Sequence, residues 1–290
     1  MITVLGASSQ IGYFLLSRLA QAHYSVLAIS RNGAPDWGVL NNICWMQHDL
    51  DEQILSNDAS VLISAGSLRH AAQVAEHMPR LQQVVAVSSS SVANKQGSAT
   101  SEEQRVLAEL QEGEQRLQAL CTDRGLILTL LRPTMVYGCG LDKNLSRIAA
   151  WLQKRPWFPL AAPAHGLRQP VHADDIAKLC VHCLDLREDA AGRFDIGGAT
   201  RLSYREMVLK TAQAINQPVR FIPLPASLLS LGLNGIARLP AFRGLNGAMV
   251  KRQNQDLVVD NSAAMKSLNW QPRIFEPTAD CFAKAIQSHH

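Results

Sequence analysis

Short apolar runs alternate with amphipathic stretches through the first two-thirds of this 290-residue chain. The runs are rich in Val, Ile and Leu, which is typical of strands buried on both faces of a parallel sheet. We predict strands at 2–5, 25–29, 43–46, 60–63, 83–87 and 126–131, and helices at 11–22, 68–78 and 102–122. Because strand and helix alternate, the predicted fold class is α/β, with a doubly wound parallel sheet whose ligand lies at the carboxyl ends of the strands.

The turn between the first predicted strand and helix has the composition of a nucleotide-binding turn. Gly6 follows the strand and Gly12 lies near the start of the helix, while Ser9 stands where such turns often carry a third glycine. A helix start presents N–H groups and a positive end to a pyrophosphate. We therefore predict a Rossmann-type domain, and a purely structural turn is the alternative. The predicted cofactor contacts in the turn are Gly6, Ser8, Ser9, Gln10, Ile11 and Gly12.

The end of the second predicted strand carries Ser30 and Arg31 instead of the acidic residue that binds an adenosine ribose in many NAD-binding proteins. A guanidinium pairs with a 2′-phosphate, whereas a carboxylate would repel it. These residues predict that NADP(H) is preferred over NAD(H). The alternative is that Arg31 is a solvated surface residue.

Composition narrows the classes of protein to which the chain can belong. The net charge is +4 with Lys and Arg scattered, so no nucleic-acid partner is expected. No apolar run approaches the roughly 18–20 residues of a membrane span, and no leader peptide is evident. The six cysteines are irregularly spaced, and Cys180 and Cys183 lack a second pair of metal ligands. We expect a cytoplasmic protein without disulfides or a metal site.

The pattern changes after Pro133, where prolines cluster and short strand candidates mix with helices. Strands are predicted at 171–172, 193–196 and 219–222, and helices at 174–186, 204–215, 262–268 and 277–287. We predict a cofactor-binding domain at 1–165, to which a strand and helix around 168–187 return, and a substrate-binding lobe over most of 188–290, in one compact unit. The apolar segment 221–247 is assigned to packing within the lobe, and a lid or a peripheral contact with a membrane are the alternatives.

The order of short motifs along nearly the whole chain is the most specific feature. They read VLGASSQIG, AISRN, HDLDE, VLISAG, VVAVSSSSV, LRPTMVYG, LRQPVHADDIA, FDIGG and LSYREM. This order resembles the extended short-chain dehydrogenase/reductase superfamily, and within it the NAD(P)-dependent epimerase/dehydratase proteins that act on nucleotide sugars. The resemblance implies a small-molecule substrate of that kind, and it makes a homodimer through helices beside the sheet an expectation.

The resemblance also implies roles for the matched positions. Cofactor contacts are implied for Asp49, Leu50, Ala65, Gly66, Ser88, Pro133 and Thr134. Substrate contacts are implied for Ser89, Asn144 and Arg168, of which the last two would hold a diphosphate. Ser90 matches the catalytic Ser or Thr of the family.

The chain departs from the family at its Tyr-x-x-x-Lys pair, in which Tyr moves a proton while the nicotinamide moves a hydride. None of the four tyrosines has Lys four residues later. When Glu114 is matched to a family Glu, the two positions fall on Val106 and Leu110, which cannot exchange a proton. Lys95 is a conceivable substitute acid, and a surface position is its alternative.

Two functions remain open. The first is an NADP(H)-binding oxidoreductase or epimerase-like enzyme that acts on a nucleotide sugar or a related phosphorylated substrate through a non-standard catalytic acid. The second is a catalytically inactive NADP(H)-binding sensor or an accessory or assembly subunit, like the complex I accessory subunits of this superfamily. The missing Tyr and Lys favour the second function, while Asn144 and Arg168 favour the first because a sensor has no need to hold a diphosphate.

Overall fold

Parallel strands form the main sheet of the computed structural model, which describes residues 1–94, 101–225 and 253–283. The sheet order within these residues is β11–β6–β5–β4–β1–β2–β3. The strands are β1 (Ile2–Leu5), β2 (Val26–Ser30), β3 (Ile43–Gln47), β4 (Val61–Ser64), β5 (Gln83–Val87), β6 (Ile127–Pro133) and β11 (Gly192–Ile196). The strand order reverses beside β1, which confirms the predicted Rossmann-type sheet and directs attention to the carboxyl ends of β1 and β4.

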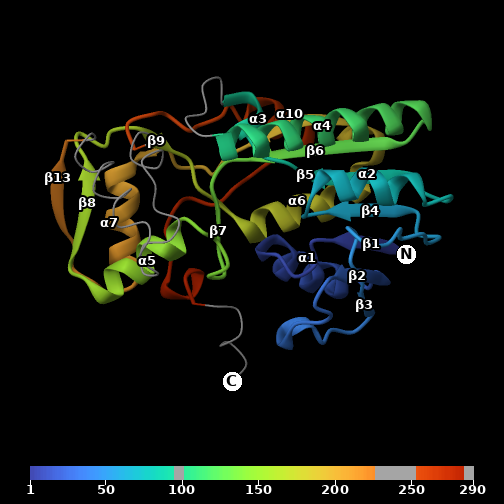
Figure 1. The fold of residues 1–290 in the computed structure, drawn as a ribbon, viewed down its shortest axis with the longest axis horizontal. Helices are drawn as coiled ribbons and strands as arrows, with labels where there is room; N and C mark the ends of the chain where they lie inside the picture. The colour runs from blue at the N-terminus through green and yellow to red at the C-terminus, as the bar shows by residue number, and fades with distance from the viewer. Residues whose placement is uncertain (95–100, 226–252, 284–290) are drawn as a thin grey trace.

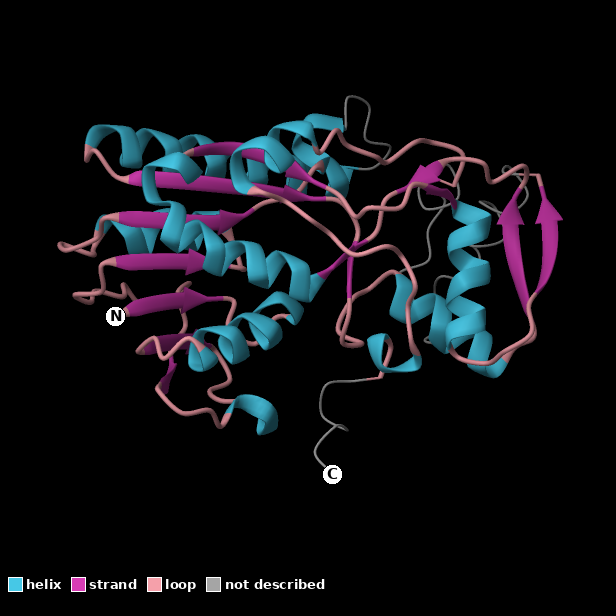
Figure 2. Cartoon of the chain, turned by 180° about the vertical axis from the view of Figure 1, so that it is seen from behind, coloured by secondary structure: helices cyan, strands magenta, loops and turns pink. Residues whose placement is uncertain are grey.

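Helices cover both faces of this sheet (Figures 1 and 2). Helices α1 (Gln10–Gln21) and α6 (Ala173–Leu186) pack together on one face, and α2 (Leu68–Glu76) and α4 (Ser101–Asp123) pack on the other. Side chains alternate across each strand, so Val4 joins the first layer and Leu5 the second. Helix α10 (Ser262–Leu268) returns late in the chain and packs beside α6 and β11.

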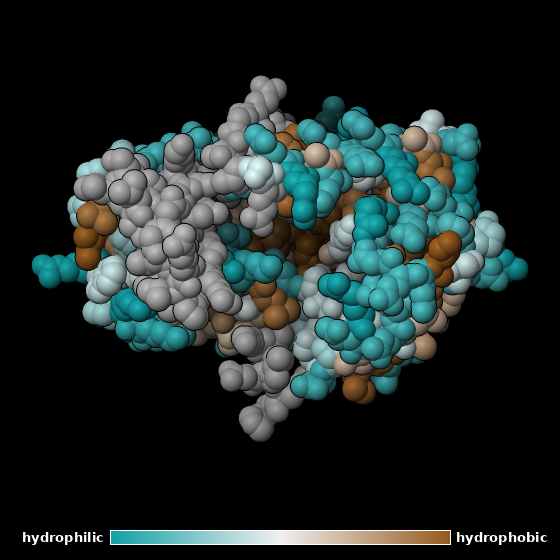
Figure 3. Space-filling view, in the orientation of Figure 1, coloured by the Kyte–Doolittle hydropathy of each residue, from teal (hydrophilic) through white to brown (hydrophobic). Residues whose placement is uncertain are grey.

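A smaller lobe lies beside the carboxyl edge of the sheet (Figure 1). Its core is formed by α5 (Leu145–Lys154) and α7 (Tyr204–Ala214), with side chains such as Leu152, Met207 and Phe275. Three short strand pairs complete the described part of the lobe: β7 (Val136–Tyr137) with β10 (Val171–His172), β9 (Leu167–Arg168) with β12 (Leu202–Ser203), and β8 (Trp157–Ala161) with β13 (Arg220–Leu224). The 3-10 helix η4 (Ala279–Cys281) packs with them. The other short helices follow elements of the sheet part along the chain: η1 (Asp36–Gly38), α3 (Ser91–Asn94) and η2 (Arg187–Ala190). The sheet part and the lobe meet at a hollow with apolar side chains at its floor (Figure 3).

The element predictions differ from the structure mainly in the lobe. Strands of the main sheet begin and end within two residues of the predicted positions. Helix α5 and strand β8 were not predicted, because the prolines that follow α5 and surround β8 indicated irregular structure. The helix predicted at 277–287 is wrong over 277–283, where only the 3-10 helix η4 forms, and residues 284–290 lie outside the described part.

Two other predictions concern the division into domains and the segment 221–247. The division into domains at 165 and 188 stays a prediction. Most of the apolar segment 221–247 falls outside the described residues, so its role stays a prediction as well. No helix within the described ranges has the length and apolar character needed to cross a membrane.

Candidate functional site

The glycine turn is packed tightly against the end of β4. Gly6 has φ +67°, and a Cβ there would lie 2.6 Å from the carbonyl carbon of Ala65. A Cβ on Gly12 would lie 2.2 Å from the carbonyl oxygen of Ala7. Gly66 also lies close to the turn, since its own Cβ would be 3.3 Å from Gly6 Cα. Backbone rather than side chains therefore forms the surface beside β1, where the strand order reverses.

Ser9 has a structural role in this turn. It is the N-cap of α1, and its hydroxyl oxygen accepts a hydrogen bond from Gly12 N at 3.1 Å. The backbone N–H groups of Gln10 and Ile11 follow in the first turn, where no intrahelical partner is available. The helix start is thus ordered with donors directed outward, as an anion-binding turn requires.

The ends of β2 and β3 lie side by side next to the turn. His48 N donates to Ser30 O at 3.0 Å, so the residues that follow the two strands are neighbours. Ser30 is buried, and its hydroxyl lies 3.5 Å from that of Ser8, whereas Arg31 is exposed. In the segment after β3, Leu50 is buried and Asp49 accepts from the backbone N–H of Asp51. The structure therefore brings the predicted adenosine-side residues together.

The serines after β5 are held by a buried ion pair. Ser88 Oγ donates to Glu114 Oε1 at 2.5 Å, and Arg132 makes a forked pair with the same carboxylate. Burial alone would raise the pKa of Glu114, but the hydrogen bonds from Arg132 and Ser88 outweigh it and hold that pKa below its usual value. The predicted cofactor residue Ser88 is thus bound to α4, and the Glu114–Arg132 pair that fixes it was missed by sequence reasoning.

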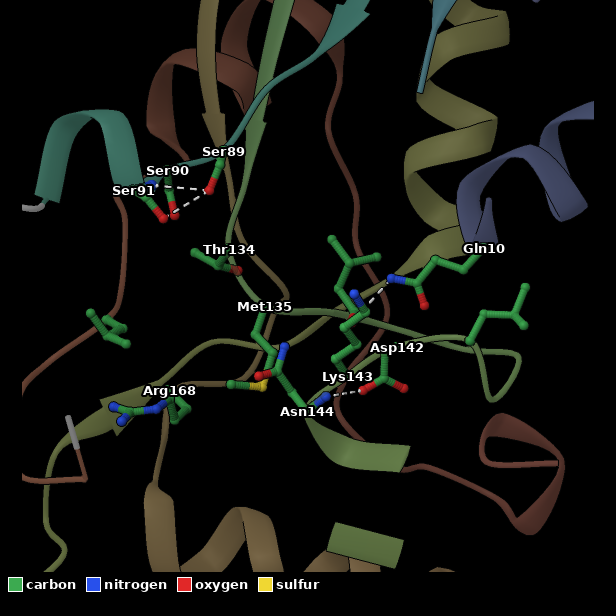
Figure 4. A pocket seen from close by; sticks show the side chains of 13 residues that line it. Gln10, Ser89, Ser90, Ser91, Thr134, Met135, Asp142, Lys143, Asn144 and Arg168 are labelled. Carbon is green, nitrogen blue, oxygen red and sulfur yellow. Dashed lines mark hydrogen bonds between the residues drawn. The ribbon is translucent and has the colours of Figure 1, made fainter. Parts of the chain in front are cut away.

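A cavity of about 420 Å³ opens beyond these serines (Figure 4). Six predicted site residues line it together: Gln10, Ser89, Ser90, Thr134, Asn144 and Arg168. The lining residues that were not predicted are Ser91, Met135, Val136, Leu141, Asp142, Lys143 and Leu257. The cavity thus connects the glycine turn and the ends of β5 and β6 with the lobe.

Around Ser90, the backbone fixes the hydroxyl at the cavity wall. Ser90 N donates to Pro133 O at 3.0 Å, and the neighbouring Ser89 Oγ donates to Ser91 Oγ at 2.9 Å. Thr134 lies opposite these serines and donates its hydroxyl to Gln169 O. The Ser90 side chain makes no hydrogen bond to any residue in the described ranges.

The two residues expected to hold a diphosphate sit in different surroundings. Asn144 is the N-cap of α5 and its side chain makes no capping hydrogen bond. Arg168 is 2% exposed and donates from Nη1 to Leu167 O and Gln255 O at 2.8 and 2.7 Å. Its guanidinium lies 5.2 Å from the centre of the Tyr204 ring, and burial lowers its pKa from the usual value. Arg168 therefore supports the junction with residues 253–257 as well as lining the cavity.

The helix expected to carry a Tyr-x-x-x-Lys pair has no proton-exchanging residue at those positions. Glu114 faces Ser88, so Leu110 and Val106, one and two turns earlier, lie toward the carboxyl edge of the sheet. Val106 is 47% exposed and Leu110 packs against the core. No tyrosine is among the described lining residues, and Lys95 lies outside the described part of the chain.

His172 and the acids after it have structural partners. His172 is buried, and its Nδ1 accepts from Asp174 N, so this imidazole caps α6. Asp174 pairs with Arg18 and Arg273, and Asp175 also binds Arg273. Cys180 and Cys183 are fully buried in the core, and the part of the chain that the structure describes has no cluster suited to a metal.

Comparison with known proteins finds that the chain is similar to sugar-nucleotide epimerases. No family model matches. The chain is 28% identical over 181 residues to a UDP-glucose 4-epimerase of Vibrio cholerae, which is 60% of this chain and 52% of that protein. It is 26% identical over 152 residues to the uncharacterized protein y4nG of Sinorhizobium fredii, of which it covers 37%. The chain thus spans about half, or less, of the curated relatives it matches.

Solved structures extend this likeness over almost the whole fold. UDP-glucuronic acid 4-epimerase of Bacillus cereus in complex with NAD has a TM-score of 0.72 at 17% identity, covering 98% of this chain and 96% of that one. MoeE5 in complex with UDP-glucuronic acid and NAD has a TM-score of 0.69 at 19% identity, covering 94% of both chains.

These structures contradict the predicted preference for NADP(H), because they contain NAD. The physical reason lies at the end of β2. A missing carboxylate does not exclude a ribose with a free 2′-hydroxyl, since hydroxyl and amide groups also bind it. Arg31 is exposed and so is consistent with the solvated alternative.

The likeness expected from the motifs is therefore confirmed: the chain has the fold of solved UDP-sugar 4-epimerases and is similar in sequence to a UDP-glucose 4-epimerase.

Proposed function

We propose that this chain binds NAD along the carboxyl edge of its sheet and a nucleotide sugar in the adjoining cavity, where it acts as an epimerase-like enzyme. The observation that carries the proposal is the cavity itself, which places Gln10 of the glycine turn, Ser90 after β5 and Asn144 of the lobe around one space. The substrate class is supported by two likenesses: a Vibrio cholerae protein similar in sequence is named as a UDP-glucose 4-epimerase, and a Bacillus cereus protein of the same fold is named as a UDP-glucuronic acid 4-epimerase.

The residues at the turn fit a dinucleotide. A Cβ at Gly6 or Gly12 would meet backbone atoms at 2.6 and 2.2 Å, so the turn offers bare backbone at the helix start. The N–H groups of Gln10 and Ile11 would face the pyrophosphate, and Leu50 with Ser30 would border the adenosine. Bound NAD supplies the hydride acceptor for oxidation of a sugar hydroxyl.

Ser90 is the residue assigned to the reacting oxygen. Its hydroxyl lines the cavity and makes no hydrogen bond to a described residue, so it can donate to a sugar oxygen. Thr134 and Ser89 would orient the ring from either side. The proton of that oxygen needs an acceptor other than Tyr, because Val106 and Leu110 occupy the Tyr and Lys positions.

The same substitution favours a second candidate, a protein that binds cofactor and nucleotide sugar without turnover. The two candidates are separated by incubating the purified chain with NAD and UDP-glucose, UDP-galactose or UDP-glucuronic acid. Sugar nucleotides are resolved by chromatography, and absorbance at 340 nm reports reduced cofactor.

An active enzyme would interconvert one epimer pair, and Ser90→Ala would lower the rate by about a hundredfold or more. Binding of both ligands without conversion would support the second candidate. Failure to bind either ligand would refute both.

A further inference from the structure

The two segments of chain that build most of the lobe carry basic residues and no acidic ones. Residues 143–173 and 207–255 include Lys and Arg throughout, and neither segment contains Asp or Glu. The first segment contains α5 and β8, and the second contains most of α7 and all of β13. Helix α5 contacts α7 and β8 pairs with β13, so the two segments lie together. The lobe therefore gathers a positive charge that the small net charge of the whole chain conceals.

The outer face of α5 is a stripe of cations around one tryptophan. Arg147, Trp151 and Lys154 follow one another at positions i, i+4 and i+7, so they share a face of the helix. Arg155 is the C-cap of α5, and its guanidinium carbon lies 4.4 Å from the centre of the Trp151 ring. The buried side chains of the helix lie on its opposite face: Leu145, Ile148, Ala149 and Leu152. Three cations thus surround one indole ring on the outside of α5.

Trp151 connects this stripe to the outer face of β8 and β13. Its Nε1 donates to Trp157 O at 2.8 Å, and the two rings meet edge to face with their centres 5.2 Å apart. Trp157 lies opposite Arg220 in the register of β8 with β13, and Ile222 follows on the same side of β13. The intervening Phe158 is buried on the other side. One continuous patch therefore runs from α5 onto the strand pair.

The lobe patch, as we call it, consists of Arg147, Trp151, Lys154, Arg155, Trp157 and Arg220, and Ile222 borders it. Arg147, Lys154 and Arg220 are exposed, and they form no ion pair with any residue that the structure describes. Ile222 is 38% exposed. Strands β8 and β13 form the end of the molecule farthest from the main sheet, with α5 beside them (Figures 1 and 2). An extended surface can therefore approach the patch from outside the lobe.

We propose that the lobe patch binds the surface of a membrane that contains anionic lipids. Cations are attracted to such a surface, and indole rings with an exposed apolar neighbour suit the boundary between headgroups and acyl chains. A single-stranded nucleic acid fits less well, because a stacked base needs an open ring face and Trp151 lies beneath Arg155 and against Trp157. Only the bordering Ile222 belongs to the segment 221–247, whose own contact with a membrane was a sequence-based alternative.

Sedimentation of the full chain with lipid vesicles tests the proposal. The wild type should bind vesicles of equal parts phosphatidylglycerol and phosphatidylcholine, should not bind phosphatidylcholine alone, and should be released by about 0.5 M NaCl. The triple variant Arg147→Gln, Lys154→Gln and Arg220→Gln should bind the anionic vesicles about a hundredfold more weakly, since each cation near such a surface contributes roughly a factor of five. Ile222→Ser should weaken binding by a few fold, because less apolar surface is buried.

A matched variant separates the lobe patch from overall charge. Arg80→Gln, Arg105→Gln and Lys178→Gln together remove the same charge from exposed positions of the sheet part, and this protein should bind anionic vesicles like the wild type. The double variant Arg147→Lys with Arg220→Lys keeps the charges of the patch and should also bind like the wild type. Circular dichroism of each variant confirms that it is folded.

Three results would overturn the proposal. The first is a wild type that binds anionic vesicles no better than neutral ones. The second is equal weakening by the two triple variants, which would assign the attraction to net charge. The third is binding of a single-stranded oligonucleotide by a wild type that does not bind vesicles. None of these results bears on NAD or UDP binding, so the proposed function is tested separately.

Discussion

The glycine turn keeps its geometry although one of its usual glycines is replaced by serine. Ser9 stands where many such turns have glycine, and its hydroxyl caps α1 by accepting from Gly12 N. The close approach of backbone depends on Gly6 and Gly12, where a Cβ would clash. The substitution therefore exchanges conformational freedom for a helix cap.

This role predicts that two substitutions of Ser9 destabilise the fold to different extents. Ser9→Ala should lower the free energy of unfolding by about 1 kcal/mol, because the cap is lost, whereas Ser9→Gly should lower it by only a few tenths of that. Urea unfolding monitored by circular dichroism measures both. Equal losses in the two variants would show that the hydroxyl does not act as a cap.

His172 gives the fold a pH dependence of defined sign. Burial among Phe14 and Tyr137, and then the charge of Arg273, lower the pKa of His172 to about 4. A depressed pKa means that the neutral form stabilises the fold above the unfolded value near 6.5, and this stability is lost as pH falls from there toward 4.

We expect the free energy of unfolding to fall by roughly 2–3 kcal/mol between pH 7 and pH 4.5. Asn at position 172 also caps helices but does not titrate, so His172→Asn should flatten this part of the profile. Urea unfolding at half-unit pH steps provides the measurement. An unchanged slope in the variant would assign the pH dependence to other groups.

At the scale of secondary-structure elements, a single ion pair joins α4 to the ends of β5 and β6. Glu114 on α4 binds Arg132 on β6 and Ser88 after β5, and the Glu114 side chain is 5% exposed. Loss of the arginine alone would leave a buried carboxylate without its charge partner, which is costly.

Arg132→Met should therefore lower the free energy of unfolding by roughly 3 kcal/mol. The double variant Arg132→Met with Glu114→Leu should recover much of that loss, because no charge remains to be buried. Both are measured by denaturant unfolding at pH 7. If the double variant is no more stable than the single one, packing rather than charge accounts for the loss.

Elements were predictable where periodicity is strong and less so in the lobe. The strands of the main sheet could be predicted because short apolar runs that alternate with amphipathic stretches are typical of buried parallel strands. Strand β8 was missed among Pro156, Pro159 and Pro163, since local signals there indicate breaks, and α5, which ends just before Pro156, was missed with it. The predicted helix at 277–287 followed apolar spacing, but the chain from Pro277 to residue 283 packs around η4 instead.

At the scale of the whole molecule, the cavity is formed by segments far apart in sequence. Ser90 and Thr134 come from strand ends that a motif identifies, so sequence reasoning found them. Lys143 and Leu257 come from loops whose approach depends on the packing of the lobe on the sheet, which no local pattern encodes. The predicted preference for NADP(H) over NAD(H) was wrong because it depended on Arg31, and one exposed arginine does not determine which cofactor binds.

Assembly of the whole molecule stays a prediction. A homodimer through helices beside the sheet was expected from family likeness. The outward face of α4 carries charged residues such as the exposed Arg105–Glu109 pair, and Arg116 pairs with Glu76 on α2. Surface pairs of this kind contribute little to the free energy of association, so a dimer through this face would be held mainly by other contacts.

The most direct test of the central claim is equilibrium binding of NAD and UDP to the purified chain, separately and together. The site beside Gly6 and the cavity beside Ser90 are adjacent but distinct, so both ligands should bind with one site each, and neither should displace the other. Absence of binding at ligand concentrations up to about 1 mM, or mutual displacement at a single site, would contradict the account.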